Sequence, residues 1–342
     1  MGKREPSIKI GIIGCGYWGP NLVRNFSAVD DCYVKFCCDI DANRLRYIQR
    51  LYPFLEVTRE YQKIIDSPDV DVIVIATPVS THFPIAIKAL NAGKDVWIEK
   101  PMTTSVKEAQ ILIKEAEKRK RIIFVDHTFI YTGAIRKIKE IIKSNALGRI
   151  LYFDSVRINL GLFQHDVNVV WDLAPHDLSI MDYLLEKTPV GIYATGVGHY
   201  NNDIENIAYL SVKFDSDMLA HFHFNWLAPV KIRQILVCGS EKMILYNDME
   251  PSEKVKVFDR GVTINQKKKE NIYQTLVSYR TGDIYSPKID TKEALSVACE
   301  HFIDCVKLRK SPITDGYSGL RVTKMIEASQ RSIKKKEHWE PI

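Results

Sequence analysis

A glycine-rich turn close to the start of the sequence constrains the fold of this chain more than any other feature. An apolar run over 9–13 leads directly into Gly14-Cys15-Gly16-Tyr17-Trp18-Gly19, and 21–26 has the pattern of a helix. In a strand–turn–helix unit of this kind, the first glycine permits the tight turn and the second lets the backbone approach a pyrophosphate. The third lets the helix pack on the strand. Unpaired N–H groups at the helix N-terminus complete a site for phosphate.

An acidic residue stands where a dinucleotide-binding unit requires one. Asp39 closes the apolar run 33–38 and follows the glycine turn by about 20 residues, the spacing at which such a carboxylate holds the adenosine ribose. A carboxylate there repels the 2′-phosphate of NADP, so NAD is the expected cofactor, and the nearby Arg44 and Arg46 keep NADP open. The other interpretation, a plain glycine turn in an α/β domain, is disfavoured because strand, turn, helix and acid agree.

Strand and helix patterns alternate through the first part of the chain. Short apolar runs alternate with segments whose apolar residues recur at helical spacing. The expected strands are 70–76, 95–98 and 122–125, and the expected helices are 82–92 and 106–120. Such alternation predicts a doubly wound parallel sheet with helices on both faces, an α/β Rossmann domain over 1–126.

The pattern changes in the remaining part, 127–342. Residues alternate between apolar and polar in several runs, which predicts antiparallel strands. The expected strands are 150–158, 208–214, 218–226 and 233–239, and the expected helices are 134–144, 172–185, 292–309 and 319–335. We therefore expect an α+β domain on a large, mostly antiparallel open sheet, whose last helices pack back on the first domain. The polar stretch 263–287 is expected to be a loop.

Composition narrows the class of protein. The net charge is +6, but the basic runs 267–269 and 334–336 carry no interleaved aromatic residues, which disfavours nucleic-acid binding. The seven cysteines lack Cys-x-x-Cys or zinc spacing, so we expect no metal and a reducing compartment. No apolar run approaches the ~18 residues of a membrane helix, and no apolar leader follows the first residues. A cytoplasmic protein without membrane contact is expected.

Two further segments suggest catalysis. Glu99-Lys100-Pro101 follows a predicted parallel strand, and ligands of open α/β sheets bind at that end. Pro101 restricts the chain, so Lys100 can be directed into the crevice; the alternative is a solvated lysine at a strand end.

Asp172 and His176 lie four residues apart on a predicted helix, hence on one face. A histidine held by a carboxylate has a fixed orientation and a tunable pKa, which suits proton exchange with a hydroxyl or carbonyl. The alternative is a helix-capping Asp172 with a histidine satisfied within the structure.

Taken in chain order, these segments resemble the Gfo/Idh/MocA oxidoreductases from residue 8 to about 185. The resemblance is carried by 11–19, Asp39, Ala76-Thr77-Pro78, Glu99-Lys100-Pro101 and Asp172-x-x-x-His176. Members of the family often have glycine where this chain has Pro175. The segments 157–161 and 166–168 also resemble a branch of the family found with sugar-nucleotide and surface-polysaccharide enzymes.

The resemblance implies a mechanism. A sugar, with nucleotide sugars favoured, would lie between the nicotinamide and the face of the antiparallel sheet. His176 would exchange a proton with a secondary hydroxyl while a hydride moves between that carbon and the nicotinamide. Lys100 would hydrogen-bond the same oxygen and stabilise its developing negative charge. Asp172 would orient His176 or hold a neighbouring hydroxyl. The cofactor carries the demanding chemistry, so no metal is needed.

The candidate site residues form three sets. The catalytic set is Lys100, Asp172 and His176. The candidate cofactor contacts are Gly14, Gly16, Tyr17, Trp18, Gly19, Asp39, Ile40, Thr77, Pro78, His82, Glu99 and Lys100. The candidate substrate contacts are Lys100, Tyr131, Arg157, Asn159, Asn168, Asp172 and His176. The two histidines His221 and His223 lack a third ligand at suitable spacing, which disfavours a metal pair.

Two alternative functions are compatible with the fold, and the sequence also predicts a homo-oligomer. The fold also hosts reductases of non-sugar carbonyls or imines, and a cofactor-binding redox sensor would need no turnover. An intact Lys100, Asp172 and His176 disfavours the sensor. A homodimer or homotetramer is expected through the open sheet face, because Phe222, Phe224 and Trp226 share one face of their strand and the opposite face would remain uncovered in a monomer.

Overall fold

The computed structural model describes residues 8–161, 167–200, 204–264, 277–335 and 338–342. The chain divides into two compact units. The first comprises Met1–Tyr131 with Lys292–Lys324, and the second comprises Thr132–Thr291 with Met325–Ile342. Each unit is built on one sheet, and the two sheets are described in turn.

The first unit contains a parallel sheet of six strands in the order β3-β2-β1-β4-β5-β6. The central strand β4 reads Val-Ile-Val-Ile and is buried along its whole length, as expected for a parallel strand covered on both faces. The strands are β1 (Ile8–Ile13), β2 (Cys32–Cys38), β3 (Glu56–Thr58), β4 (Val72–Ile75), β5 (Asp95–Glu99) and β6 (Ile123–Asp126). The predicted Rossmann sheet is thus confirmed.

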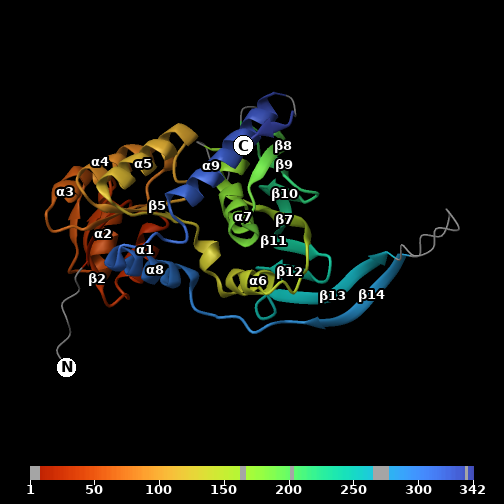
Figure 1. Cartoon of the computed structure of the whole chain (residues 1–342). Coiled ribbons are helices and arrows are strands. Elements are labelled where there is room, and N and C mark those ends of the chain that lie inside the picture. The colour runs from red at the N-terminus through yellow and green to blue at the C-terminus, as the bar shows by residue number, and fades with distance from the viewer. Residues whose placement is uncertain (1–7, 162–166, 201–203, 265–276, 336–337) are drawn as a thin grey trace. The chain divides into compact units, whose positions relative to one another are not determined.

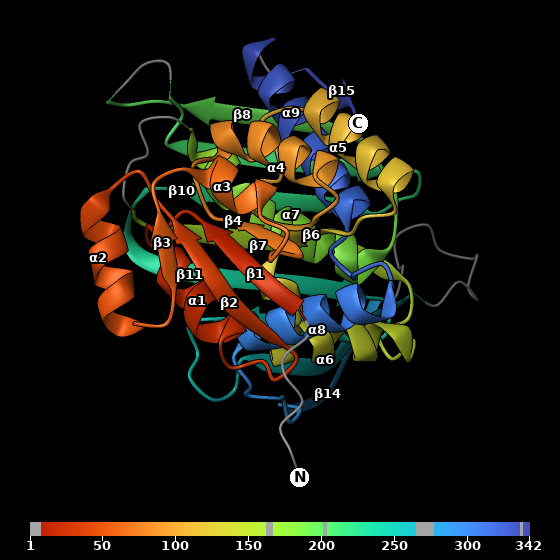
Figure 2. The same ribbon diagram turned by 90° about the vertical axis from the view of Figure 1, so that its left-hand side faces the viewer.

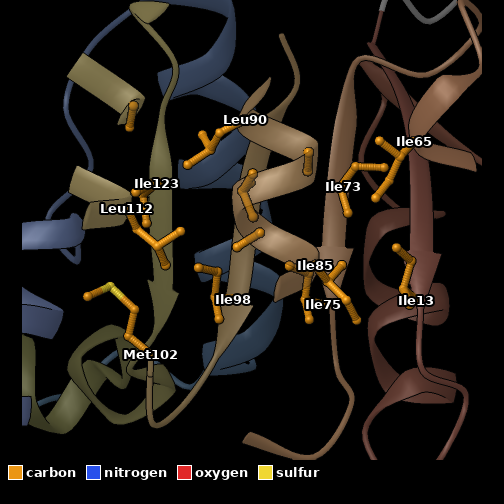
Figure 3. Packing of buried hydrophobic residues seen from close by; sticks show 14 of the residues in the cluster. Ile13, Ile65, Ile73, Ile75, Ile85, Leu90, Ile98, Met102, Leu112 and Ile123 are labelled. Carbon is orange, nitrogen blue, oxygen red and sulfur yellow. The ribbon is translucent and has the colours of Figure 1, made fainter. Parts of the chain in front are cut away.

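Helices cover both faces of this sheet (Figure 2). On one face an aliphatic core lies between the sheet and three helices, as Figure 3 shows for residues such as Ile75, Ile98 and Leu112. These helices are α3 (Tyr61–Asp66), α4 (His82–Asn91) and α5 (Val106–Arg119). Ser105 caps α5, with its hydroxyl accepting a 3.2 Å hydrogen bond from the Glu108 N–H.

An aromatic cluster fills the opposite face. Trp97 of β5 stacks on Phe124 of β6 with ring centroids 4.1 Å apart, and Phe26 and Phe302 approach the same indole edge-on. The last two come from α1 (Gly19–Phe26) and α8 (Ala294–Leu308). A segment near the C-terminus therefore completes the core of the N-terminal sheet. The remaining elements of this unit are α2 (Ala42–Leu51), η1 (Val79–Thr81) and η2 (Thr128–Tyr131).

The second unit contains a nine-stranded sheet in the order β14-β13-β12-β11-β7-β10-β9-β8-β15. Neighbouring strands are antiparallel except β7 and β10, which are parallel. This confirms the predicted large, mostly antiparallel sheet. The strands are β7 (Ile150–Leu160), β8 (Pro189–Val197), β9 (Ile207–Phe214), β10 (Leu219–Asn225), β11 (Leu227–Gly239), β12 (Met243–Asn247), β13 (Val255–Ile264), β14 (Val277–Tyr285) and β15 (Glu340–Pro341).

One face of this sheet is buried. Phe153, Phe222 and Phe224 are completely buried, while Tyr209 and Leu219 on the opposite face are 41% and 45% exposed. Helix α7 contacts β7, β9 and β10. The helices with residues in this unit are α6 (Gly133–Lys143), α7 (Val169–Leu185) and α9 (Gly316–Lys334), which begins in the first unit.

One sequence prediction is wrong in this unit. Part of the polar stretch expected to be a loop forms β14, which pairs with β13 in a long hairpin (Figure 1). Residues 265–276, with the basic run 267–269, lie outside the described residues. Backbone pairing to β13 stabilises this strand despite its polar composition, because the ladder hydrogen bonds do not depend on side-chain polarity.

Candidate functional site

The glycine turn has the geometry that its sequence predicts. Gly14 has a φ of +102°, and a Cβ on it would lie 2.5 Å from the Ala76 carbonyl oxygen. A Cβ on Gly19 would collide with the carbonyl oxygen of Gly14, so the start of α1 lies directly against the turn. The nearest atom to a Cβ on Gly16 is in the Arg44 side chain, 3.5 Å away, which leaves this backbone open to a ligand. The turn can therefore accept a phosphate group.

Asp39 is bound to this turn. It is 7% exposed, and its Oδ2 accepts a 2.7 Å hydrogen bond from the Cys15 N–H. Its Oδ1 accepts a 2.9 Å bond from the Asp41 N–H. The Arg44 guanidinium lies 3.6 Å from Oδ2. Asp39 thus fixes the turn, and any ribose hydroxyl would share its oxygens with these donors.

A shallow hollow of about 390 Å³ opens beside the turn. Its lining consists of Cys15, Gly16, Tyr17, Pro20, Asn43, Arg44 and Tyr47. The other apolar candidates for cofactor contact are exposed here: Tyr17 is 85%, Trp18 40% and Ile40 81% exposed. Large exposed apolar side chains around a phosphate-binding turn can flank a planar group of a ligand.

His82 is placed differently from the prediction. Its ring is 1% exposed, with Nδ1 2.9 Å from the Pro101 carbonyl oxygen and Nε2 2.8 Å from that of Thr77. Burial lowers the pKa of this imidazole. Both ring nitrogens are thus engaged by the backbone, which replaces the predicted cofactor contact with a role in connecting the segments after β4 and β5. Thr77 is half-buried and Pro78 exposed at this sheet edge.

Lys100 directly follows β5, as predicted, and is half-buried. Burial lowers the pKa of His82 and that of His127, with the charge of Lys100 as a smaller cause in both. For His127, where Arg321 also contributes, the pKa falls to about 3. Burial and the neighbouring Asp126 raise the pKa of Glu99 well above its ordinary value. The carboxyl edge of β5 and β6 therefore places Lys100 among buried titratable groups whose pKa values burial shifts toward their neutral forms.

Tyr131 lies in the core of the first unit. It is 3% exposed, stacks on Phe124 with ring centroids 5.7 Å apart, and its hydroxyl lies 3.1 Å from Thr314 Oγ1. The predicted substrate contact is corrected to a core position, because Thr314, 183 residues away in the sequence, satisfies its hydroxyl.

In the second unit, α7 presents Asp172 and His176 together. Both are half-buried, whereas Ala174, Pro175 and Asp177 between and after them are buried. Trp226, 1% exposed, donates a 3.1 Å hydrogen bond from its indole Nε1 to Asp172 Oδ2. The helix begins at Val169, so the alternative of a capping Asp172 is wrong, and Asn168 is the N-cap. The sequence analysis placed Trp226 on a face of the sheet and did not identify it as a residue of this site.

Pro175 lies inside α7, immediately before His176. Proline has no N–H, so the ladder bond from this position to the carbonyl of Trp171 is absent. An interior proline costs about 3 kcal/mol relative to alanine in a helix. This local cost falls on the turn that carries the candidate acid–base pair.

Arg157 is placed in a buried ion pair. It is 4% exposed, and its guanidinium Nη2 donates a 3.2 Å hydrogen bond to Asp177 Oδ1, while Nε donates to Oδ2. Ser155 donates a further 2.9 Å bond to Oδ1. The predicted substrate contact is therefore corrected: Arg157 joins β7 to α7 at the residue after His176. In the sequence, the partner of Arg157 is marked only by the acidic character of Asp177, the residue after His176.

Asn168 also has a structural role, because its side chain hydrogen-bonds other parts of the protein. Its Oδ1 accepts a 3.1 Å bond from the Trp171 N–H, and its Nδ2 donates to Glu205 and to Gln330 at 2.5 and 3.0 Å. Because both ends of the amide are used, the predicted substrate contact is corrected to a helix cap. Asn159 is half-buried on β7 and keeps its candidate role. Asp166 lies outside the described residues.

The described residues form neither a metal centre nor a membrane span. They contain no group of three or more His, Cys, Asp or Glu side chains arranged to hold a metal ion. None of their helices has the length and apolar character needed to span a membrane. The imidazole of His223 instead stacks on Tyr209 with ring centroids 4.4 Å apart.

A Rossmann unit with an open phosphate turn, joined in one chain to a large antiparallel sheet, defines a class of NAD-binding oxidoreductases. The model of the oxidoreductase family with NAD-binding Rossmann fold matches residues 8–127, and the Gfo/Idh/MocA C-terminal domain model matches 135–245. The chain belongs to the Gfo/Idh/MocA family.

Curated relatives match along nearly the whole chain. The myo-inositol 2-dehydrogenase of Thermotoga maritima is 22% identical over 340 residues, 96% of this chain and 97% of the relative. The UDP-N-acetylglucosamine 3-dehydrogenase of Acidithiobacillus ferrooxidans is 24% identical over 335 residues, 92% and 94% of the two chains. A levoglucosan dehydrogenase solved with NADH superposes with a TM-score of 0.83 at 19% identity, covering 98% of this chain and 99% of that one. At this level of identity, the similarity to the levoglucosan dehydrogenase shows that the two proteins share a fold.

Proposed function

We propose that this protein is an NAD-dependent dehydrogenase that interconverts a secondary hydroxyl and a keto group of a sugar, with nucleotide sugars as the favoured class. The observation that carries this proposal is the Asp172–His176 pair on α7, which is half-buried and whose Asp172 accepts a hydrogen bond from the Trp226 indole. It occurs in a chain whose other unit is an NAD-binding Rossmann domain. An acid–base pair beside a redox cofactor is what alcohol oxidation requires.

Each catalytic residue has a defined task. When bound, the nicotinamide accepts or supplies the hydride. The imidazole of His176 takes the hydroxyl proton in oxidation and returns it in reduction. The Lys100 ammonium donates a hydrogen bond to the same oxygen and stabilises its negative charge. The carboxylate of Asp172, oriented by Trp226, holds either His176 or an adjacent sugar hydroxyl. Asn159 is proposed to contact a substrate hydroxyl.

The cofactor contacts follow from the first unit. Gly14, Gly16 and Gly19 form the proposed pyrophosphate turn, and Asp39 accepts hydrogen bonds from the adenosine ribose. Tyr17, Trp18, Ile40, Thr77, Pro78, Glu99 and Lys100 complete the proposed contacts. Because Arg44 lies 3.6 Å from the Asp39 carboxylate, it offsets part of the repulsion toward a 2′-phosphate. NAD is therefore preferred and NADP is a weaker alternative.

The names of two relatives support the substrate class. The relatives from Thermotoga maritima and Acidithiobacillus ferrooxidans are a cyclitol and a nucleotide-sugar dehydrogenase. Both names describe oxidation of a polyhydroxylated ring, which the proposed acid–base pair would serve.

Turnover with a defined panel tests this proposal. The purified protein is incubated with NAD or NADP and with UDP-N-acetylglucosamine, other nucleotide sugars, free sugars and myo-inositol, and reduced cofactor is followed by absorbance. Oxidation of at least one ring hydroxyl with NAD supports the proposal. Turnover confined to non-sugar carbonyls or imines, or nucleotide binding without any turnover, would replace it with the alternative reductase or the redox sensor.

We further propose that the protein is a homodimer or homotetramer assembled through the open face of the second sheet. Tyr152, Tyr209, Leu219 and Leu236 are 37%, 41%, 45% and 40% exposed in the single chain. They come from β7, β9, β10 and β11, which are neighbours in that sheet. An apolar sheet face of this kind is normally covered by another surface, and a symmetric copy is the simplest cover.

A further inference from the structure

A cavity of about 650 Å³ lies in the first unit, at the edge of the parallel sheet where the strands begin. It is lined by the end of α5, the start of β6 and the segment from the end of α8 to the start of α9. The glycine turn and Lys100 follow the opposite ends of β1 and β5, which run parallel to β6 in this sheet. The cavity is therefore separate from the proposed cofactor site, and its volume is within the range of small-molecule sites, about 300–1,000 Å³.

Two helix ends bring four cationic side chains to this cavity. The left-handed residues Lys120 and Arg309 end α5 and α8, with φ of 55° and 52°. Arg121 and Lys310 follow them directly, and all four side chains line the cavity. A cation near a helix C-terminus is favoured by the helix dipole, so the positions of these residues do not by themselves require a ligand.

The pairing of these cations does point to a ligand. Arg309 is neutralised by Asp95, whose Oδ2 lies 2.7 Å from the guanidinium Nη1. Among the residues that the structure describes, Lys120, Arg121 and Lys310 form no ion pair. The Nε atom of Arg121 is also buried and has no hydrogen-bond partner among these residues. A buried N–H donor without an acceptor is unfavourable, which indicates that the acceptor comes from outside the chain.

Two carboxylates also line the cavity, and both are held by neutral donors. Asp315 accepts a 2.9 Å hydrogen bond from the Ser318 N–H and a 3.1 Å bond from the Ser311 hydroxyl. Glu117 accepts a 2.5 Å hydrogen bond from the Tyr317 hydroxyl. Within the described part of the chain, neither carboxylate forms an ion pair with a cation of the cavity. The positive charge of Arg121 is therefore available to a ligand.

The rest of the lining is mainly apolar. Ile113 and Ala116 of α5 and Ile123 of β6 contribute buried side chains, and Tyr317 at the start of α9 is 48% exposed. A planar guanidinium binds a phosphate or a carboxylate through parallel hydrogen bonds. A phosphate monoester has more charge and three acceptor oxygens, so it suits a cavity with several unpaired cations better than a carboxylate does.

We propose that this cavity binds a phosphate monoester with a small apolar body. Arg121 donates hydrogen bonds to the phosphate oxygens, and Lys120 and Lys310 add positive charge around them. The body of the ligand lies against the apolar side chains of α5 and β6. The site does not depend on the proposed dehydrogenase activity, because it shares no residue with the proposed catalytic and cofactor-binding sets.

Isothermal titration calorimetry of the full-length protein tests this site, with phenyl phosphate as the probe. Titrations with and without saturating NAD separate the cavity from the glycine turn, the other expected phosphate site of this unit. With NAD present, phenyl phosphate should bind more tightly than inorganic phosphate, because only the former has a ring for the apolar wall. Phenol, which lacks the anion, should not bind. Loss of phenyl phosphate binding in the presence of NAD, or no binding at millimolar concentration, would overturn the proposal.

Matched variants assign the binding to the cavity. Arg121→Gln should weaken phenyl phosphate binding by about tenfold or more, because it removes a charge-assisted hydrogen bond. Arg119→Gln is the control, because Arg119 pairs with Glu115 and lies outside the cavity lining, and it should change the affinity by less than about twofold. Equal effects of the two variants would indicate a general attraction between charges and would refute the site.

Lys310→Gln provides a second test at an exposed position, where the fold is not at risk. It should weaken binding by about threefold, as expected for the loss of one solvated cation near the phosphate. Circular dichroism of each variant checks that the fold is retained. If Arg121→Gln does not fold, an unchanged affinity in Lys310→Gln would refute the proposal and a weakened one would support it.

Discussion

The indole Nε1 of Trp226 donates a 3.1 Å hydrogen bond to Oδ2 of Asp172, and this bond connects the end of β10 to the first turns of α7. Trp226 is 1% exposed, so its donor cannot be satisfied by bulk water. The carboxylate is thereby held in one orientation on the helix that also carries His176. A reactive pair is better defined when one of its members is held by a buried neighbour.

A double-mutant cycle tests this bond. Trp226→Phe removes the donor and keeps an aromatic ring, and Asp172→Leu removes the acceptor and keeps a side chain of similar length. We expect the two changes to be coupled by about 1.5–3 kcal/mol in the free energy of unfolding, the range for hydrogen bonds to charged groups. Urea denaturation of the four proteins gives the coupling. Strictly additive effects would show that the indole does not hold the carboxylate.

Removing Lys100 or His176 should suppress turnover and leave the fold intact. We expect Lys100→Ala and His176→Ala to lower kcat by about 10²–10⁴-fold, with much smaller changes in NAD affinity, because both groups are proposed to act in the transition state. Lys107→Ala, at an exposed position of α5, is the matched control and should retain wild-type kcat. A variant of either proposed residue with near-normal kcat on a confirmed substrate would exclude that residue from the catalytic set.

The Arg157–Asp177 ion pair should contribute strongly to stability. Arg157→Met leaves a carboxylate that is 2% exposed without its cation, so we expect a loss of about 3–5 kcal/mol in the free energy of unfolding. Arg149 and Asp217 form an exposed pair, with side chains 69% and 97% exposed, and Arg149→Met should cost at most about 1 kcal/mol. Chemical denaturation compares them. A stable Arg157→Met protein with weakened substrate binding would restore the substrate role predicted from sequence.

His127 should make the wild-type protein sensitive to mild acid. Burial and the charges of Lys100 and Arg321 lower its pKa from 6.5 to about 3, so the unfolded chain binds a proton that the folded chain does not. The contribution of neutral His127 is fully present above pH 6.5 and is lost as pH falls toward 3. At pH 5 this loss amounts to about 2 kcal/mol.

His127→Phe separates this effect from general acid sensitivity. The free energies of unfolding of the variant and of wild type are compared at pH 7.5 and pH 5. Phenylalanine has no proton to bind, so the difference between the two proteins should shift in favour of the variant by about 2 kcal/mol at the lower pH. Parallel pH dependences of the two proteins would mean that His127 is protonated in the folded state.

Assembly through the open sheet face predicts a mass above 39.3 kDa, the mass of one chain. Light scattering at micromolar concentration should give two or four times this value. Leu219→Glu and Leu236→Lys place charges on the exposed face, and they should dissociate the assembly while leaving the fold of the chain unchanged. A single-chain mass for the wild-type protein would contradict this proposal, because no second chain would then cover the exposed apolar residues.

The sequence alone was sufficient for features whose cause is local. The glycine turn could be predicted because the positive φ of Gly14 and the close approach of Gly19 to Gly14 are local requirements. Asp39 could be placed because it directly follows the apolar strand β2. The parallel sheet was predictable from the alternation of apolar runs, because the hydrophobic periodicity of a segment reports its local burial. The placement of Lys100 at a strand end and of Asp172 with His176 on one helix follows from the same local patterns.

Only the tertiary structure decided how polar side chains are used. Arg157, Asn168, Tyr131 and His82 all carry groups suited to a ligand, yet each binds a protein group from elsewhere in the chain. Glu99 and Asp126 likewise become neighbours only through the register of β5 and β6. A sequence shows the donors and acceptors of each residue, but only the folded chain determines which of them satisfy one another and which remain open to a ligand.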